Sequence, residues 1–284
     1  MIVKKIKIYN DKIDNKVKIA LISDIHFSDY TKMKTLNRIH KNIQSNNPNY
    51  ICIVGDIIDD NSSLKNIDNM KLINSWINNL SLVCPVIIVL GNHDYLDHKT
   101  GSFIYPTNWI NELKNIDNVY VLDNKVKVFN NICFYGYEAP FKYYIYNGKH
   151  TEDTSFLIDD FNKKLKIKNN NKYNILLFHS PIRIFSDKCI NEINNFKNIN
   201  LILTGHMHNG LVPIFLDKII PKNKGFVGPY RSFFPKLARG IVKKDNQIMI
   251  ISGGVTKLAK SASKLMAKLN FIYPAQIEYI EIKK

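Results

Sequence analysis

The sequence contains little cysteine and no long uncharged apolar run. Its four cysteines among 284 residues form no Cys-x-x-Cys pair, which argues against a disulfide-stapled scaffold or a thiolate zinc site. Cys52, Cys84 and Cys133 lie in or beside apolar strand-like runs, so we expect reduced core residues. No apolar stretch approaches the roughly 18 residues of a membrane span, and no export signal is visible. We therefore expect a cytoplasmic protein without a transmembrane anchor.

Acidic residues are also scarce. The chain has 24 Asp and Glu against 40 Lys and Arg, which gives a formal net charge of +16. A surplus of this size favours anionic partners, such as phosphate compounds, nucleic acid or an acidic membrane face. The alternative is a lysine-rich surface that is merely solvated. Hydrophobic residues make up 45% of the chain, enough for a core, and we expect a single domain over residues 1–284.

Apolar runs of strand length recur along the chain. Near-continuous Ile, Leu and Val in "VKIALISDIH", "YICIVGDIID", "PVIIVLGNHD", "NILLFHSP" and "INLILTGHMH" are typical of strands buried on both faces. Helical spacing of apolar residues predicts one helix from Met33 to before Pro48 and another over 64–80, which gives a β-α-β-α-β order with parallel strands. Residues 118–137 predict antiparallel hairpins, and a helix is expected near 153–166. The sequence therefore predicts an α/β fold with a mixed sheet system flanked by helices.

Each of the five apolar runs ends in polar residues. In open α/β sheets, ligands gather at the carboxyl ends of the strands, so we expect these side chains to converge. A gap of one residue, as in "DIH" and "HMH", places both side chains on the same side of an extended chain. The polar residues are Asp24 and His26; Asp56 and Asp59; Asn92, His93 and Asp94; His179; and His206 and His208.

The chemistry of this set indicates two metal ions. Carboxylate, imidazole and amide groups without thiolate suit Mn²⁺, Fe²⁺, Fe³⁺ or Zn²⁺, and we expect manganese first. Two such ions about 3.5–4 Å apart can hold a bridging hydroxide and clamp a phosphoryl group for in-line displacement. A carboxylate shared between the ions is the expected bridge.

The ordered motifs "DIH", "GDIID", "GNHD", "FHSP" and "GHMH" resemble those of the calcineurin-like metallophosphoesterases. The resemblance spans residues 24–208. It implies a four-layer α/β sandwich, in which helices flank two mixed β-sheets, and a dinuclear metal centre. Carried onto the matching positions, it implies that one metal is held by Asp24, His26, Asp56 and His208, and the second by Asp56, Asn92, His179 and His206.

The resemblance also gives the "GNHD" motif a catalytic role. His93 is expected beside the substrate, where it stabilises the developing charge and protonates the leaving oxygen. Asp94 is expected to orient that imidazole, and Asp59 to support the site from outside the metal ligands. Gly55 and Gly91 stand directly before two ligands, where the backbone must approach the metals closely; ordinary turn glycines are the alternative.

Segments outside the motifs should determine the substrate. Residues 255–270 place Lys257, Lys260, Lys264 and Lys268 on one helical face beside an apolar stripe, which is typical of a helix on an anionic membrane surface. The alternative is a helix packed on the domain with its lysines in water. We expect the basic segment 219–270 to cap the site or to contact the inner face of a membrane.

An aromatic loop over 135–146 is the second such segment. Its rings either line a pocket for a base or an acyl chain or pack in the core at a sheet edge, and Glu138 is a candidate polar contact near the metals. The aromatic residues are Tyr135, Tyr137, Phe141, Tyr143 and Tyr144.

Three functions are compatible with these features. The first is a phosphodiesterase or pyrophosphatase acting on a small molecule or a lipid head group, as in a bacterial branch that resembles the UDP-2,3-diacylglucosamine pyrophosphatases; the lysine-rich tail departs from that branch. The second is a metal-dependent nuclease, although no nucleic-acid-binding module is recognisable. The third is a non-catalytic scaffold, which the complete set of metal-ligand types disfavours. We expect the first.

Overall fold

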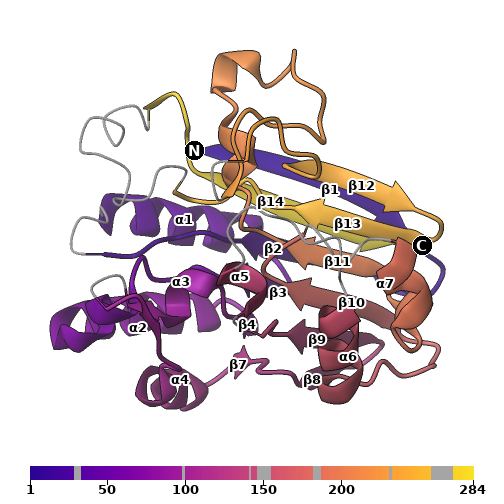
Figure 1. Ribbon diagram of the computed structural model, residues 1–284, viewed down its shortest axis with the longest axis horizontal. Helices are drawn as coiled ribbons and strands as arrows, with labels where there is room; N and C mark the ends of the chain where they lie inside the picture. The colour runs from indigo at the N-terminus through magenta and orange to yellow at the C-terminus, as the bar shows by residue number, and fades with distance from the viewer. Residues whose placement is uncertain are drawn as a thin grey trace.

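Two six-stranded sheets form the centre of the structure (Figure 1). This computed structural model describes residues 1–28, 33–97, 100–140, 142–145, 155–181, 187–229, 232–256 and 271–284. The first sheet has the strand order β1 (Ile2–Tyr9), β14 (Gln276–Lys283), β2 (Val17–Ile22), β3 (Tyr50–Val54), β4 (Val86–Val89) and β7 (Val119–Val121). The second has the order β12 (Gly240–Lys244), β13 (Gln247–Ile251), β11 (Leu201–Thr204), β10 (Tyr173–Phe178), β9 (Ile132–Tyr137) and β8 (Val126–Phe129).

Both sheets are mixed, as the sequence predicts. In the first sheet β2, β3, β4 and β7 run parallel, and β14 is antiparallel to β2. In the second sheet β9, β10, β11 and β13 run parallel, while β8 and β12 pair antiparallel at the two edges. The parallel strands are buried along nearly their whole length, which explains their continuous Ile, Leu and Val content.

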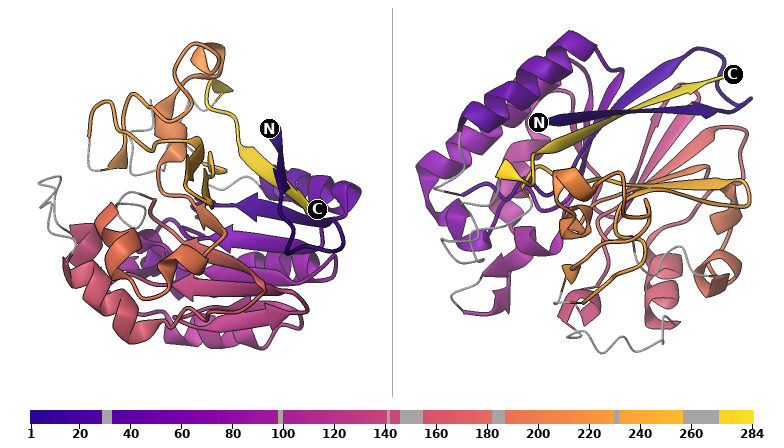
Figure 2. Two further views of the ribbon diagram at one scale, coloured as in Figure 1. Left: turned by 90° about the vertical axis from the view of Figure 1, so that its right-hand side faces the viewer. Right: turned by 90° about the horizontal axis from the view of Figure 1, so that it is seen from above.

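Helices cover the outer faces of the two sheets (Figure 2). On the first sheet, Leu36, Ile77 and Trp109 belong to one core cluster with the strands, and on the second Phe161 joins another. A third cluster, which includes Leu21 and Leu177, fills the space between the sheets. This is the predicted four-layer sandwich. The covering helices are α1 (Met33–Asn46), α2 (Ile67–Ser81) and α4 (Thr107–Lys114) on one side and α6 (Ser155–Lys164) and α7 (Asp187–Glu192) on the other.

Helix α1 shows how the local sequence sets an element. Leu36, Ile39 and Ile43 are its buried residues, at the predicted helical spacing. The helix ends when Asn47 adopts a left-handed φ of 44° and its N–H binds the carbonyl of Ile43, a common way to end a helix. The buried face of α1 therefore packs in the same core cluster as strand β3.

The prediction for residues 118–137 is only partly correct. Strands β8 and β9 form the expected antiparallel hairpin. Strand β7, however, pairs in parallel with β4 in the first sheet. Both Val119 and Val121 are buried in the cluster beneath α2 and α4, so contacts distant in sequence prevail over a local turn.

Several features expected from the sequence lie outside the described residues. They include most of the basic segment 255–270, together with Phe141 of the aromatic loop. Within the described part of the chain, no helix is long and apolar enough to cross a membrane.

Candidate metal centre

The predicted polar residues meet where strands of both sheets end. Asp24 and His26 follow β2, Asp56 follows β3, and Asn92 opens the short helix α3 (Asn92–Tyr95) after β4. From the second sheet, His179 follows β10, while His206 and His208 follow β11. One ligand atom from each of Asp24, His26, Asp56 and His208 lies within 4.8 Å of the others, and the same holds for Asp56, His179 and His206.

Asp56 belongs to both groups. Its Oδ2 lies 3.1 Å from Nε2 of His179 and 3.6 Å from Nε2 of His26. Its Oδ1 accepts the backbone N–H of His93 at 2.9 Å. The carboxylate is fully buried, so it stands between the two groups at the position of a shared ligand.

Backbone carbonyls set the tautomers of two imidazoles. Nδ1 of His179 lies 2.8 Å from the carbonyl oxygen of Val54, and Nδ1 of His208 lies 2.7 Å from that of Thr256. A carbonyl can only accept, so each Nδ1 carries a proton and each Nε2 faces the centre, where it can bind a metal once it is deprotonated. Nδ1 of His26 is likewise bonded to a side-chain oxygen of Asp59 at 3.0 Å. Asp59 thus contacts the candidate ligand His26 from outside the two groups.

The second group also has the spacing of ligands to one ion. Nδ1 of His206 lies 3.1 Å from Nε2 of His179, which is the separation of two nitrogens bound at about 2.1 Å and roughly a right angle. The buried Oδ1 of Asn92 has no hydrogen-bond partner among the described residues. A buried acceptor of this kind is costly unless a ligand satisfies it. The residues present therefore fit two metal ions.

The ligand loops adopt an unusual backbone conformation. Five of the seven candidate ligands have left-handed φ values between 46° and 69°, at Asp24, His26, Asp56, His206 and His208. Each such non-glycine residue costs on the order of 1–3 kcal/mol, and such conformations cluster at functional sites. This concentration distinguishes the ligand loops from ordinary turns.

Two glycines allow the close approach that the sequence suggests. A Cβ on Gly55, whose φ is 79°, would collide with the ring of His179. A Cβ on Gly91 would collide with Oδ1 and the backbone nitrogen of Asp56. Each glycine therefore leaves the space that a neighbouring ligand occupies.

Burial and neighbouring charges set the protonation states of the histidines and of Asp56. Burial lowers the pKa of the His208 imidazole to about 4 and that of His206 well below its ordinary value. Burial acts in the same direction on His179, but the Asp56 carboxylate raises the pKa of that imidazole to about 9. At Asp56 burial acts upward, yet the charges of His179 and His93 hold the carboxyl pKa well below its usual range. The site thus has an ionised carboxylate and two imidazoles that are neutral at pH 7.

The "GNHD" motif is organised differently from the sequence expectation. Nδ1 of His93 lies 2.8 Å from the backbone carbonyl oxygen of Asp59, not against the Asp94 carboxylate. Asp94 instead accepts backbone N–H groups from Ile57, Ile58 and Gly91 at 2.8 to 3.0 Å. It therefore ties the loop after β3 to the loop after β4, and the expected orientation of His93 comes from Asp59.

The aromatic loop divides between core and site. Tyr135 and Tyr137 are fully buried in the second sheet's outer core, so the core interpretation holds for them. The ring of Tyr144 lies 5.7 Å from that of His206. Glu138 is buried and its Oε2 accepts a 2.5 Å hydrogen bond from the Tyr95 hydroxyl, at the end of α3. Its Oε1 has no partner among the described residues.

Sequence reasoning missed three supporting groups. Ser23 donates to the carboxylate of Asp24, and the carbonyls of Val54 and Thr256 orient two histidines. Ser23 precedes a recognisable motif and could have been proposed. The two carbonyls carry no side-chain signal, because any residue could supply them.

Relatives with similar sequences are described as uncharacterized metallophosphoesterases. A protein of Helicobacter pylori (strain J99) described as an uncharacterized metallophosphoesterase is 27% identical over 210 residues, which cover 74% of this chain and 49% of the relative. A similarly described protein of Campylobacter jejuni is 24% identical over 225 residues, covering 79% and 52%. The chain thus spans about half the length of the curated relatives it matches.

The comparisons also give a solved structure and a family. The crystal structure of a dimetal phosphatase from Danio rerio aligns with 84% of this chain and 87% of that one, at 12% identity and a TM-score of 0.46. Residues 17–210 match the family described as calcineurin-like phosphoesterase. This range includes every candidate ligand and most of both sheets. The chain belongs to the calcineurin-like phosphoesterase family.

Proposed function

We propose that the chain is a phosphodiesterase or pyrophosphatase that acts on a small molecule or a lipid head group with two divalent metal ions. The position of Asp56 in both ligand groups carries the proposal, because a shared carboxylate is what two adjacent ions require. When bound, the ions would polarise the phosphoryl oxygens and generate the nucleophile from water. One ion would be held by Asp24, His26, Asp56 and His208, and the other by Asp56, Asn92, His179 and His206.

His93 is the proposed proton donor. Its backbone N–H binds Asp56 and its Nδ1 binds the carbonyl of Asp59, so both the backbone and the ring of His93 are fixed. The ring stands edge-on to His26, with ring centroids 4.6 Å apart. Burial lowers the pKa of this imidazole, whereas the Asp56 carboxylate acts upward. Because Nδ1–H is donated to a carbonyl, Nε2 would transfer a proton to a leaving oxygen from the doubly protonated ring. An alkoxide leaves poorly without that proton, so the donor matters most for esters with unactivated leaving groups.

Manganese is the proposed metal. The ligand set consists of carboxylates, imidazoles and one amide, with no thiolate among the converging residues. Such a set suits Mn²⁺, with iron and zinc as the alternatives. Asp94 would act by fixing the two loops that carry Asp56 and Asn92, because it binds their backbones.

Hydrolysis by reconstituted protein tests the proposal. Metal-stripped protein is reloaded with Mn²⁺, Fe²⁺ or Zn²⁺ and assayed on bis-p-nitrophenyl phosphate and p-nitrophenyl phosphate. We expect diester turnover to return with metal and to be lost in Asp56→Asn. Asp68→Asn, an exposed carboxylate in α2, is the matched control and should behave like the parent. Faster turnover of the monoester would contradict the diester proposal, and turnover without metal would contradict the dinuclear site.

A further inference from the structure

The chain after the metal ligands exposes large apolar side chains. We call residues 213–229 and 232–239 the upper lobe; it projects from the sandwich beyond the strand ends (Figures 1 and 2). Four of its apolar side chains, and Phe271 beside it, are between 67% and 78% exposed. Water-exposed aromatic groups of this size seldom gather on a surface without a binding role. The four in the upper lobe are Phe215, Ile219, Phe233 and Phe234.

Two contacts gather these side chains into one region. The N–H of Ile214 binds the carbonyl of Ile272 at 3.0 Å, which brings the turn η4 (Ile214–Leu216) beside Phe271. In the same lobe, residues 224–227 pair with 233–236 through two antiparallel bridges. Phe233 and Phe234 follow directly on the turn of this short hairpin. The apolar groups therefore stand on two projections of the lobe, which Arg239 joins by donating to the carbonyls of Asp217 and Lys224.

Phe234 is held outward by its backbone. Its φ is 51°, a conformation that is uncommon for a bulky side chain. The strained residue is fixed because its N–H binds the carbonyl of Phe226 at 2.9 Å. Strained conformations that persist tend to mark functional positions. An exposed ring in a strained backbone is thus a specific feature of the lobe and not an unstructured end.

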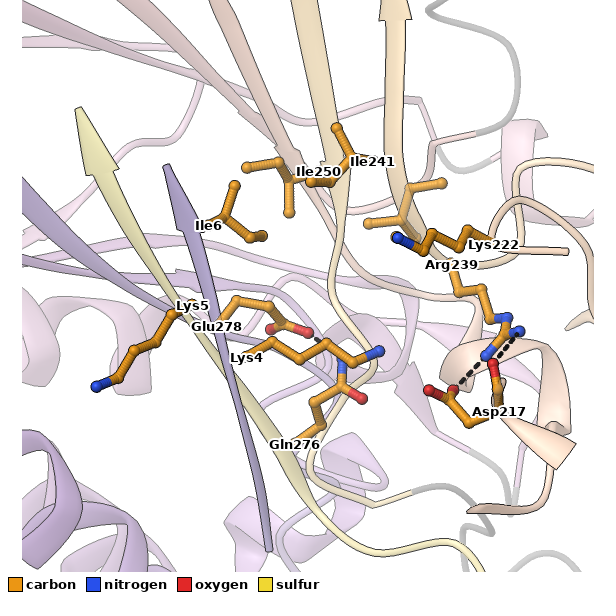
Figure 3. Close-up of a pocket in the computed structure, with 12 residues that line it drawn as sticks. Lys4, Lys5, Ile6, Asp217, Lys222, Arg239, Ile241, Ile250, Gln276 and Glu278 are labelled. Carbon is orange, nitrogen blue, oxygen red and sulfur yellow. Dashed lines mark hydrogen bonds and ion pairs between the residues drawn. The ribbon is translucent and has the colours of Figure 1, made fainter. Parts of the chain in front are cut away.

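The charge around these groups is positive. Four lysines of the lobe are exposed. The lobe's one acidic residue, Asp217, is paired with Arg239, which is 3% exposed and also donates to the carbonyl of Ile220 at 2.6 Å (Figure 3). The charge that faces solvent is therefore cationic. The exposed lysines are Lys218, Lys222, Lys224 and Lys236.

A groove at the base of the lobe is also lined by apolar side chains and lysines. It has a volume of about 290 Å³ and runs between β1 and β12, with Ile6 and Ile241 in its lining (Figure 3). Lys4 and Lys222 line it from opposite sides. The carboxylate of Glu278 in the same groove accepts bonds from Ser252 and the N–H of Gly253, each 2.9 Å long. The Glu278 carboxylate is thus bound by these neighbouring donors, and lysines are the main charged residues in the lining of the groove.

We propose that the upper lobe is a membrane-binding surface, which inserts Phe215, Ile219, Phe233 and Phe234 into the interface of an anionic bilayer while its lysines bind the lipid head groups. Apolar side chains flanked by lysines are the combination that binds such surfaces. A second copy of the chain fits less well, because pairing through this face would bring the lysines of both copies together.

Membrane binding would also orient the metal centre. The lobe begins a few residues after His208, whose Nδ1 donates to the carbonyl of Thr256. The bilayer contact and His208 are therefore joined by the short segment 209–212. Binding of the lobe is nevertheless independent of which phosphoester the centre hydrolyses.

Vesicle flotation with the full chain tests the surface. Vesicles of phosphatidylcholine alone are compared with vesicles that also contain 30% phosphatidylglycerol, added as the probe of roughly cell-like anionic charge. We expect binding only to the anionic vesicles and a loss of at least about tenfold on raising the salt, since head-group attraction is screened. Phe233→Ser/Phe234→Ser and Phe215→Ser/Ile219→Ser should each weaken binding by about tenfold or more.

Two further variants separate the contributions. Replacing the four lobe lysines with glutamine should remove the preference for anionic vesicles. Leu82→Ser, an exposed apolar residue at the end of α2, should bind like the parent. Unchanged binding of both serine variants would overturn the proposal. So would failure of the parent to float while it hydrolyses bis-p-nitrophenyl phosphate, because that result leaves the reaction intact. All of these variants should keep the parent's turnover of that water-soluble ester.

Discussion

Nε2 of His179 lies 3.1 Å from Oδ2 of Asp56, although the two residues come from different sheets. Asp56 follows β3 of the first sheet, and His179 follows β10 of the second. The packing of the two sheets against each other therefore sets the ligand spacing. The hydrogen bond from Nδ1 of His179 to the carbonyl of Val54 also joins the two sheets. The metal centre is thus a joint product of both sheets, and its geometry depends on the core between them.

Asp56→Asn should remove metal and activity together. The variant keeps the side-chain volume but loses the negative charge that two ions would share. Turnover should fall by more than about 100-fold, beyond the range for loss of a residue that only supports a ligand. The metal-free variant should also unfold more easily, by on the order of 3–5 kcal/mol, because the buried His179 loses its counter-charge. Elemental analysis and thermal unfolding measure the two effects; a variant that retained two ions would contradict the shared-ligand assignment.

His93→Gln should slow turnover while leaving the metals bound. In the proposed assignment the imidazole holds neither ion and protonates the leaving oxygen, so the substitution removes only the proton donor. The turnover number should fall by about 10²–10⁴ for an alkyl phosphodiester. It should fall less for bis-p-nitrophenyl phosphate, whose leaving group needs no proton. The test compares the turnover numbers for the two substrates at full metal loading. An equal loss of turnover on both would argue against a proton donor.

Gly91→Ala should disrupt the site by a collision. The added Cβ would meet Oδ1 and the backbone nitrogen of Asp56, so the carboxylate must move. We expect weaker metal binding than in Gly101→Ala, where the added Cβ meets nothing within 4 Å although the φ of 66° strains the backbone. Metal titration of both variants decides the point. If Gly91→Ala bound metal as tightly as Gly101→Ala, the close packing of these loops would be wrong.

Glu138 should make the stability depend on pH. Burial, together with the nearby Asp123, raises the pKa of the Glu138 carboxyl to about 8, whereas in the unfolded chain it titrates near 4.3. Between these values the folded protein binds the additional proton, so stability should fall as the pH rises from about 4.3 to 8. Glu138→Gln cannot ionise and should lose this dependence. Its melting temperature relative to the parent should rise by several degrees from pH 5 to pH 9, and parallel curves would contradict the assignment.

The convergence of the candidate ligands could be predicted because each follows an apolar run. Burial on both faces identifies such a run as a central strand, and its carboxyl end opens on one edge of the sheet. That local pattern places Asp24, Asp56 and His206 without any knowledge of the loops. Helical spacing of apolar residues identifies α1, and turn residues identify the hairpin of β8 and β9, whose contacts are close in sequence.

The remaining features depend on contacts that sequence spacing does not encode. Asp94 stands next to His93 in the chain, yet its carboxylate accepts two backbone N–H groups from the loop after β3 and a third from Gly91. Strand β7 pairs with β4 in the first sheet, because Val119 and Val121 are buried in the core cluster of that sheet. The sequence alone does not show whether an aromatic residue such as Tyr135 packs in the core or lines a pocket, because that depends on the assembled sheet.

Anomalous diffraction from crystals loaded with Mn²⁺ tests the central claim most directly. Two peaks on either side of the Asp56 carboxylate, about 3.5–4 Å apart, are the predicted result. One peak should touch His26 and His208, and the other Asn92, His179 and His206. A single peak, or two peaks that do not share Asp56, would contradict the dinuclear centre.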